Sequence, residues 1–234
     1  ISMIQAEQLQ KRYGTDTALD IDQLTIEKSE CFGLVGNNGA GKTTFFQLIL
    51  DLIRTTNGRV SINGQNVAEH EQWKTITGSY LDEHMLLPFL SPDEYFSTLQ
   101  KLYDLSDGDL DKQLERFDIL FNGEIRDTNK YIRNLSKGNL KKVGIAAAFL
   151  GSPDLILLDE PFENLDPTSQ SRLKKIIESE REENGTTFLI SSHDLTHVTD
   201  ICNRIVLLEK GRVIKDLKDN KEVMAAALSD YFDR

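Results

Sequence analysis

The feature that most constrains this chain is a glycine-rich loop between a short apolar run and a helical pattern. The run Cys31–Val35 is typical of a buried strand, and helical periodicity extends over Thr43–Ile53. The segment between them matches the pattern G-x-x-x-x-G-K-[ST] and consists of Gly36, Asn37, Asn38, Gly39, Ala40, Gly41, Lys42, Thr43 and Thr44. Glycines let such a loop turn back on itself, so that backbone N–H groups point inward at phosphates. The loop therefore predicts a site for a nucleoside triphosphate, which we interpret as ATP.

Two side chains of this loop carry specific expectations. Lys42 is predicted to reach the β- and γ-phosphates, and the hydroxyl of Thr43 is predicted to ligate Mg²⁺. The helix that follows adds the positive end of its dipole to the same place.

An acidic pair follows another apolar run. Leu155–Leu158 is typical of a buried strand, and Asp159 and Glu160 come directly after it. Ligands of a parallel sheet bind at the carboxyl ends of its strands. We therefore expect Asp159 to hold Mg²⁺, through water, and Glu160 to take a proton from an attacking water. Taken alone, the pattern fits a strand and a solvated turn equally well, and the phosphate loop favours the catalytic interpretation.

Strand and helix patterns alternate along the chain. The other strand-like runs are Ile4–Leu9, Ala18–Ile26, Arg59–Ile62, Gly78–Leu81, Thr187–Ser191, Ile205–Leu208 and Arg212–Lys215. The other helical patterns lie at Asp109–Phe121, Leu140–Leu150, Pro167–Glu183, Leu195–Ile201 and Asn220–Asp230. This alternation predicts an α/β fold with a mainly parallel sheet, and the helical middle reads as an inserted lobe.

The order of the motifs resembles the ATP-binding cassette of ABC transporters over nearly the whole chain. Leu135–Asn139 stands at the place of the family signature, which is usually Leu-Ser-Gly-Gly-Gln. Asn164-Leu165-Asp166 resembles the family's D-loop, and Ser191-Ser192-His193 ends in its switch histidine. Tyr13 stands where the family has an aromatic residue that stacks on adenine.

The resemblance implies the fold in more detail. It implies a P-loop NTPase core with a mainly parallel sheet, an N-terminal antiparallel β subdomain and an inserted helical subdomain. We expect one ATP-binding domain over 3–234, with a core at about 3–82 and 151–216, a helical subdomain at about 83–150 and a C-terminal helix at about 219–230. Residues 1–2 read as a tag remnant before a native start at Met3.

The resemblance also implies the roles of individual residues. It assigns catalysis to Glu160, His193 and Lys42, with ATP and Mg²⁺ as the bound groups. Ser136, Gly138 and Asn139 are expected to meet the γ-phosphate bound by a second copy of the chain, and Asp166 to link the two sites.

Two positions depart from the family pattern. Asp82 falls where the Q-loop glutamine normally ligates Mg²⁺; it is one methylene shorter, and Glu83 is an open alternative. Lys137 replaces the first signature glycine. If that position requires a positive φ, lysine is strained there; otherwise its ammonium adds positive charge beside the partner's γ-phosphate.

The composition of the chain limits the classes of partner and the environment that we expect for it. Basic residues number 27 against 38 acidic ones, and the net charge of −11 argues against nucleic-acid binding. The two cysteines lie in apolar stretches and read as buried thiols, and His197, outside any motif, reads as solvated. The longest apolar run, Val143–Leu150, is far short of the roughly 18 residues of a membrane span.

The chain is therefore expected to be soluble and to work on the cytoplasmic face of the membrane through separate transmembrane permease subunits. The resemblance favours export. Two rival interpretations stay open at this point. One is a soluble ABC-type ATPase that is not coupled to transport, and the other is a regulatory ATP-binding subunit with low turnover.

Overall fold

A six-stranded sheet, in the order β10–β9–β3–β8–β7–β6, forms the centre of the protein. The structure, a computed structural model, describes residues 1–218 and 221–232. The strands are β3 (Cys31–Val35), β6 (Thr77–Tyr80), β7 (Leu155–Leu158), β8 (Thr187–Ser192), β9 (Arg204–Glu209) and β10 (Arg212–Leu217). All neighbouring pairs run parallel except β10 with β9, which is an antiparallel edge. The expected α/β fold with a mainly parallel sheet is confirmed.

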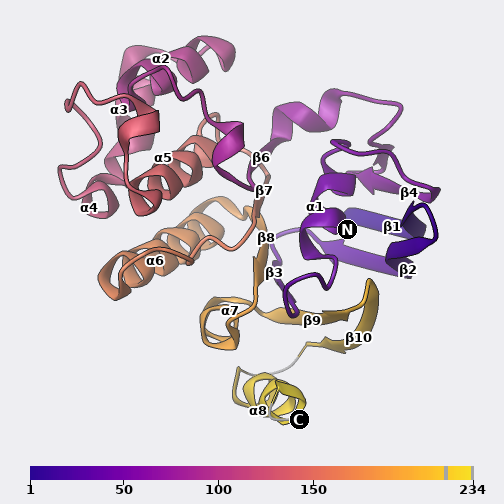
Figure 1. Ribbon diagram of the computed structural model, residues 1–234. Helices are drawn as coiled ribbons and strands as arrows, with labels where there is room; N and C mark the ends of the chain where they lie inside the picture. The colour runs from indigo at the N-terminus through magenta and orange to yellow at the C-terminus, as the bar shows by residue number, and fades with distance from the viewer. Residues whose placement is uncertain (219–220, 233–234) are drawn as a thin grey trace.

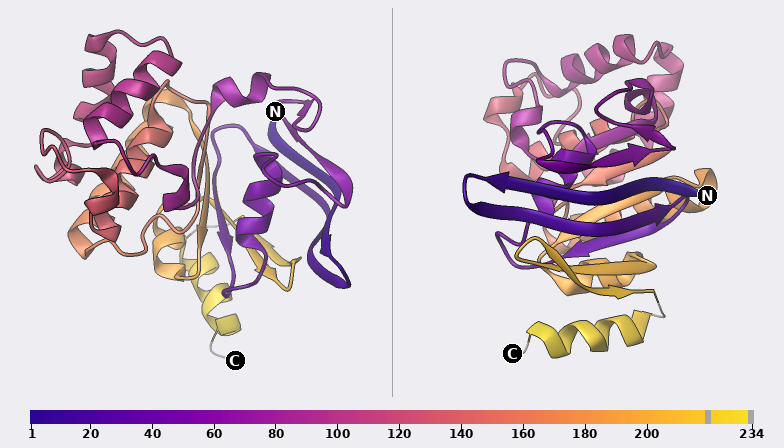
Figure 2. Two further views of the ribbon diagram at one scale, coloured as in Figure 1. Left: turned by 45° about the horizontal axis from the view of Figure 1, so that its top comes forward. Right: turned by 90° about the vertical axis from the view of Figure 1, so that its right-hand side faces the viewer.

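A second sheet, in the order β2–β1–β4–β5, is antiparallel and comes mostly from the N-terminal part of the chain. Its strands are β1 (Ser2–Tyr13), β2 (Asp16–Glu27), β4 (Asn57–Ile62) and β5 (Gln65–Asn66). The long β1–β2 hairpin runs across the front in the right-hand view of Figure 2. This is the antiparallel N-terminal sheet that the resemblance implied.

The first helix, α1 (Lys42–Ile49), packs in the core between the two sheets. Phe45 and Phe46 are fully buried there, among apolar side chains of both sheets. Leu155 and Leu157 of β7 join this core, whereas Ile156 and Leu158 join a second core on the opposite face. Because successive strand residues point to opposite faces, a strand buried on both faces reads as a continuous apolar run.

Helices cover the second face of the central sheet and build a separate lobe. They are α2 (Pro92–Leu102), α3 (Asp107–Glu115), α4 (Asp118–Phe121), α5 (Lys137–Phe149), α6 (Pro167–Asn184), α7 (Leu195–Ile201) and α8 (Lys221–Phe232), with short 3₁₀ helices at Gln72–Ile76, Glu83–Met85 and Ile132–Asn134. Figure 1 shows α2 to α5 gathered at the upper left, away from the antiparallel sheet. None of the helices in the described ranges is long and apolar enough to span a membrane.

Helix α5 packs directly against β6 and β7. Gly144 makes this approach possible, because a Cβ atom at this position would lie only 2.1 Å from Cε2 of the Tyr80 ring. The helix therefore lies close to the carboxyl end of β7, where the acidic pair follows.

Some helix boundaries differ from the expectations. The predicted helix Asp109–Phe121 is two helices, α3 and α4, which break at Arg116 and Phe117. Helix α5 begins at Lys137 rather than at Leu140, because Ser136 caps it by accepting a hydrogen bond from the Asn139 backbone N–H. Helix α1 ends at Ile49, four residues before the predicted end. Of the expected C-terminal helix, residues 219–220 lie outside the described ranges.

The two cysteines, Cys31 and Cys202, are buried free thiols whose Sγ atoms lie 3.7 Å apart. This confirms their interpretation as small buried apolar groups. Burial raises the pKa of the Cys202 thiol well above its usual range, and its contact with Cys31 adds to this effect.

Candidate active site

The phosphate loop runs from the end of β3 to the first turn of α1. Gly41, which precedes the helix, has a φ of 105°, and a Cβ atom there would lie 2.8 Å from the carbonyl oxygen of Ala18. Gly41 offers no capping side chain, so the first backbone N–H groups of α1 remain available to an anion. The structure confirms the expected loop between a strand and a helix N-terminus, and it shows in addition that the loop lies close to Ala18 of β2.

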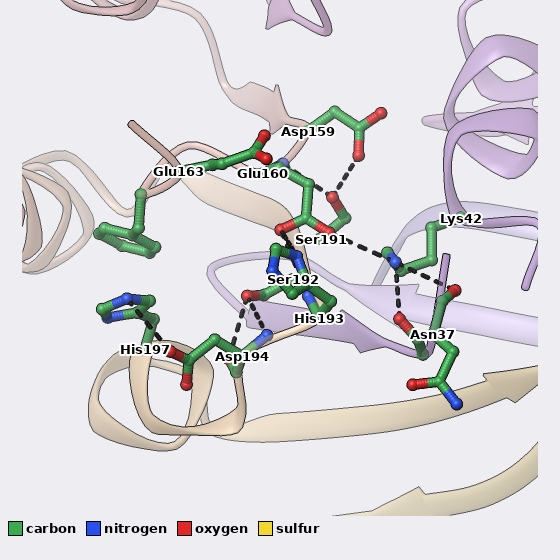
Figure 3. A network of polar contacts seen from close by, with 12 residues as sticks. Asn37, Lys42, Asp159, Glu160, Glu163, Ser191, Ser192, His193, Asp194 and His197 are labelled. Carbon is green, nitrogen blue, oxygen red and sulfur yellow. Dashed lines mark hydrogen bonds and ion pairs between the residues drawn. The ribbon is translucent and has the colours of Figure 1, made fainter. Parts of the chain in front are cut away.

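Lys42 curls back into the loop rather than pointing at solvent (Figure 3). Its Nζ donates to the carbonyl oxygens of Gly36 at 2.6 Å and of Asn37 at 3.5 Å. It also forms an ion pair with Glu160, 3.3 Å from Oε1. The side chain is only 6% exposed, so its charge is concentrated where the loop would enclose phosphates.

Asp159 joins the phosphate loop to the end of β7. Its Oδ2 accepts a hydrogen bond of 2.5 Å from the hydroxyl of Thr43, and its Oδ1 accepts one from the hydroxyl of Ser191 on β8. The two strands are parallel neighbours, so their carboxyl ends bring these groups together. Burial raises the pKa of Asp159, against the opposing effect of the hydrogen bonds from Ser191 and Thr43.

The residues around Asp159 fit a Mg²⁺ ion. Magnesium prefers hard oxygen ligands, and it commonly takes one or two protein carboxylates together with substrate phosphates and water. The hydroxyl of Thr43 and the carboxylate of Asp159 are such ligands, and they already lie in contact. Asp82 and Glu83 line the same cavity. Asp82 Oδ1 accepts a hydrogen bond of 2.7 Å from the backbone N–H of His84, and the choice between Asp82 and Glu83 stays a prediction.

Glu160 is held in place by contacts to its backbone and to both carboxylate oxygens. Its backbone N–H donates to Ser191 Oγ at 2.9 Å. Oε1 lies against Lys42, and Oε2 accepts from the backbone N–H of His193 at 3.2 Å and contacts its Nδ1 at 2.9 Å. Figure 3 shows these side chains converging from β7, β8 and α1. The side chain is 19% exposed although its Oε1 atom is buried, and the carboxylate is oriented by two neighbours.

The signature residues lie on another cavity of the same chain. Ser136, Gly138 and Asn139 line it together with the D-loop residues Asn164 to Asp166. Asn139 Nδ2 donates to Glu124 Oε2 at 3.0 Å. The phosphate-loop residue Thr43 lines the other cavity, with Asp159 and Glu160. Ser136, Gly138 and Asn139 thus lie on a different cavity from Thr43, whereas Lys137 of the signature and Asn164 of the D-loop line the cavity of Thr43 as well.

The D-loop aspartate has a local role as well. Asp166 caps α6, because its carboxylate accepts from the backbone N–H of Ser169 at 3.0 Å and from its hydroxyl at 2.5 Å. These hydrogen bonds lower the pKa of Asp166. The proposed link between two sites stays a prediction.

Tyr13 lies at the end of β1 with its side chain half exposed. The ammonium of Lys11 lies 4.9 Å from the centre of its ring. An exposed aromatic ring is suited to stacking on a base, and the adenine contact stays a prediction.

Two expectations are corrected. Lys137 is the first residue of α5 and has a helical backbone, so the idea that it is strained by a positive φ is wrong. His197 is not solvated: its side chain is 15% exposed, and its ring packs in a tilted arrangement on that of Phe162, with the ring centres 4.8 Å apart. Burial lowers the pKa of His197, and the nearby carboxylate of Asp194 partly opposes this.

Two residues of the site were missed as contributors. Ser191 bonds both Asp159 and the backbone of Glu160, and its position at the carboxyl end of a strand next to β7 is the signal that identifies it. Lys141 donates from α5 to the carbonyl oxygen of Glu160 at 2.6 Å. No short sequence motif predicts this hydrogen bond, because the bond depends on how α5 packs against the central sheet.

The fold and this site together define an ATP-binding cassette. The profile of the ABC transporter family matches residues 19–163, well over half of the chain. The chain therefore belongs to the ABC transporter family, among its ATP-binding proteins.

Characterised and uncharacterised relatives agree with this assignment. An uncharacterised ABC transporter ATP-binding protein of Bacillus subtilis, YhaQ, is 35% identical over 91% of this chain and 70% of its own length. The bacitracin transport ATP-binding protein BcrA of Enterococcus faecalis is 33% identical over 92% of this chain and 69% of its own. The linearmycin resistance ATP-binding protein LnrL of Bacillus subtilis is 30% identical over 91% of this chain and 68% of its own length.

Solved structures show the same fold. An ATP-binding subunit of an ABC transporter superposes with a TM-score of 0.85 at 26% identity, over 97% of this chain and 100% of that one. The cassette MJ0796, in a dimeric post-hydrolysis state bound to ADP and Pi, superposes with a TM-score of 0.81 at 26% identity. The match covers 92% of this chain and 98% of that one. The chain cbiO1 of Clostridium perfringens, part of the ABC transporter complex cbiONQ, superposes with a TM-score of 0.78 at 25% identity. The match covers 97% of this chain and 92% of that one.

Proposed function

We propose that this chain hydrolyses ATP as one of two cassettes that drive separate membrane subunits. One observation carries the proposal: the carboxylate of Glu160 lies between Lys42 and His193, beside the Thr43–Asp159 contact. A base, a phosphate-binding cation and a polar sensor thus surround the place where a γ-phosphate would lie. Phosphoryl transfer depends mainly on such positioning and electrostatics.

The contacts of Lys42 suggest how binding and chemistry follow one another. Its ammonium forms an ion pair with Glu160 and a hydrogen bond to the carbonyl oxygen of Gly36. Phosphate oxygens of ATP would take over this ammonium, and Glu160 would then stay oriented by His193 alone. Its free carboxylate oxygen can accept a proton from the attacking water. Mg²⁺, held by Thr43, Asp159 and Asp82 or Glu83, would supply charge neutralisation on the phosphates.

The signature residues fit a second copy of the chain as partner. Ser136 begins α5, and a helix N-terminus is suited to an anion. Ser136, Gly138 and Asn139 line a cavity separate from that of Thr43, which supports the proposal that they meet the γ-phosphate of a nucleotide held by another copy. We further propose that the exposed ammonium of Lys137 tightens this ATP-driven pairing. Dimerisation of Lys137→Gly with ATP should be weaker than that of the wild type; equal or stronger pairing would contradict the idea.

The membrane subunits are proposed to dock against the helical lobe near residues 83–104. Met85, Leu87 and Phe89 are exposed apolar side chains in this segment, and Phe89 is 60% exposed. Exposed apolar side chains next to one another are typical of interaction surfaces. We propose that the chain works on the cytoplasmic face of the membrane through these subunits, and that it does not act on nucleic acid. Export is the proposed direction, since relatives are named for bacitracin transport and linearmycin resistance.

An ATPase assay on the purified chain, with and without its co-purified membrane partner, tests the proposal. We expect Mg²⁺-dependent phosphate release that increases when the partner is present. An equal rate of hydrolysis with and without the membrane partner would favour an ABC-type ATPase that is not coupled to transport. Tight ATP binding without turnover, in both preparations, would favour a regulatory subunit and would overturn the proposed activity.

A further inference from the structure

We propose that Lys141 is a positioning residue for the catalytic carboxylate: it holds the backbone of Glu160 from the side of α5. Its Nζ donates to the Glu160 carbonyl oxygen at 2.6 Å. The inference rests on the proposed ATPase function, because it concerns how the base of that reaction is held. It adds a residue of α5 that lines the cavity of Thr43, Asp159 and Glu160 and donates its hydrogen bond to the backbone of Glu160.

The backbone of Glu160 needs such support. Its φ of 47° is in the left-handed region, which is unfavourable for residues with a Cβ atom. Pro161 follows, and a residue before proline is normally driven to an extended conformation with negative φ. A strained conformation persists only where the surroundings over-determine it.

The surroundings of Glu160 meet this condition from two sides. Ser191 on β8 accepts from its N–H at 2.9 Å, and Lys141 on α5 donates to its C=O at 2.6 Å. Both backbone polar groups of the strained residue are therefore bound by side chains from other elements. This leaves the carboxylate with its own contacts, to Lys42 and His193.

Lys141 is itself well placed to act as a fixed support. Its side chain is only 12% exposed, and one further carboxylate, that of Glu163, lies 3.9 Å from its Nζ. One helical turn further along α5, Gly144 packs against the ring of Tyr80 and brings the helix close to β6. A hydrogen bond from a charged donor is stronger than a neutral one, so this contact holds the carbonyl group firmly.

The support also connects two parts of the molecule. Lys141 belongs to the helix that begins at the signature serine, Ser136, whereas Glu160 follows the central strand β7. A contact that joins these elements makes the position of the base depend on the position of α5.

The decisive experiment measures steady-state and single-turnover ATP hydrolysis for the full chain and for Lys141→Met, which keeps the length of the side chain but removes the donor. We expect kcat to fall roughly tenfold to hundredfold, as for small displacements of a catalytic group. The KM and the Kd for ATP should change by less than about twofold, because the phosphate loop keeps its contacts. Lys141→Arg, which retains a cationic donor, should recover most of kcat.

A second comparison separates positioning from general destabilisation. In a Glu160→Gln background, Lys141→Met should cause little further loss of single-turnover rate, because the lysine acts through the group already removed. Lys112→Met, on an exposed position of α3, is the matched control for loss of a lysine and should keep the wild-type rate.

The outcomes distinguish the two proposals. If the wild-type chain releases no phosphate under any condition, the proposed function fails and this inference fails with it. If the wild type is active, an unchanged kcat in Lys141→Met overturns the inference alone. So does an equal, additional loss in the Glu160→Gln background, or a failure of Lys141→Arg to recover activity.

Discussion

The substitution Glu160→Gln tests the centre of the proposed mechanism, because it removes one charge and almost no volume. The amide oxygen of glutamine can still accept from the His193 backbone N–H, which lies 3.2 Å from Oε2 in the wild type. The amide nitrogen would then face Lys42, at the place where Oε1 now lies 3.3 Å from Nζ. The side chain keeps its position, but the ion pair is lost.

The substitution should change the rate of hydrolysis and the affinity for ATP, and the size of each change can be worked out. Loss of a general base lowers the rate by about 10²–10⁴-fold, which corresponds to about 3–5 kcal/mol of barrier at about 1.4 kcal/mol per factor of ten. Lys42 no longer has a carboxylate to leave when ATP arrives. If the lost pair is worth about 1 kcal/mol after desolvation, ATP should bind about fivefold more tightly. Catalysis and binding are thus expected to change in opposite directions.

The assay combines phosphate release with equilibrium binding of ATP at fixed Mg²⁺. Glu163→Gln is the matched control, because it lies on the same turn, is 53% exposed and has its nearest cation, Lys141 Nζ, at 3.9 Å. It should stay within about twofold of the wild type in both measurements, as expected for an exposed pair. Wild-type turnover in Glu160→Gln would refute the role of Glu160 as the base. A large loss of ATP affinity would refute the idea that ATP displaces Glu160 from Lys42.

Three further predictions concern the metal, the core and pH. Thr43→Val should lower hydrolysis at limiting Mg²⁺ and recover in part as Mg²⁺ is raised, because it removes one of two adjoining oxygen ligands; a Mg²⁺ titration of kcat checks this. Arg116→Ala should destabilise the fold by about 3 kcal/mol in denaturant unfolding, because it leaves the carboxylate of Glu180, 4% exposed, without its ion partner. Burial lowers the pKa of His197 below its usual 6.5, so the unfolded chain takes up a proton first and the folded state loses stability as pH falls through this range. His197→Gln should therefore flatten the pH dependence of unfolding between about pH 7.5 and 5.5; an unchanged slope would contradict the assignment.

The sequence predicted the central sheet well because its strands are buried on both faces. Leu155–Leu158 reads as an unbroken apolar run, and the structure places alternate residues in two different cores. The same pattern does not determine where helices end. The predicted helix Asp109–Phe121 breaks at Arg116 and Phe117, where tertiary contacts intervene: Arg116 binds Glu180 of α6, and the ring of Phe117 packs at 5.2 Å on Phe149 of α5.

The site shows a similar division. Motifs identified the groups that belong to one short segment, such as Lys42 and Thr43, because their backbone geometry is local. They did not identify the contact of Lys141 with the carbonyl oxygen of Glu160, which joins residues 19 positions apart and depends on the packing of α5. They also misjudged His197, whose ring is covered by Phe162 from outside its own helix.

The arrangement of charges in a single chain gives a physical reason for the proposed pairing of two chains. Within the chain, the charge of Lys42 is balanced by the carboxylate of Glu160, and its Nζ also donates to the carbonyl oxygen of Gly36. Ser136, Gly138 and Asn139 line a separate cavity, so in one chain they are not on the cavity that Thr43 lines. The negative charge of the γ-phosphate would favour binding of a second copy, which presents the helix N-terminus that Ser136 caps. Binding of ATP would then create the attraction that brings two chains together, and hydrolysis would remove it.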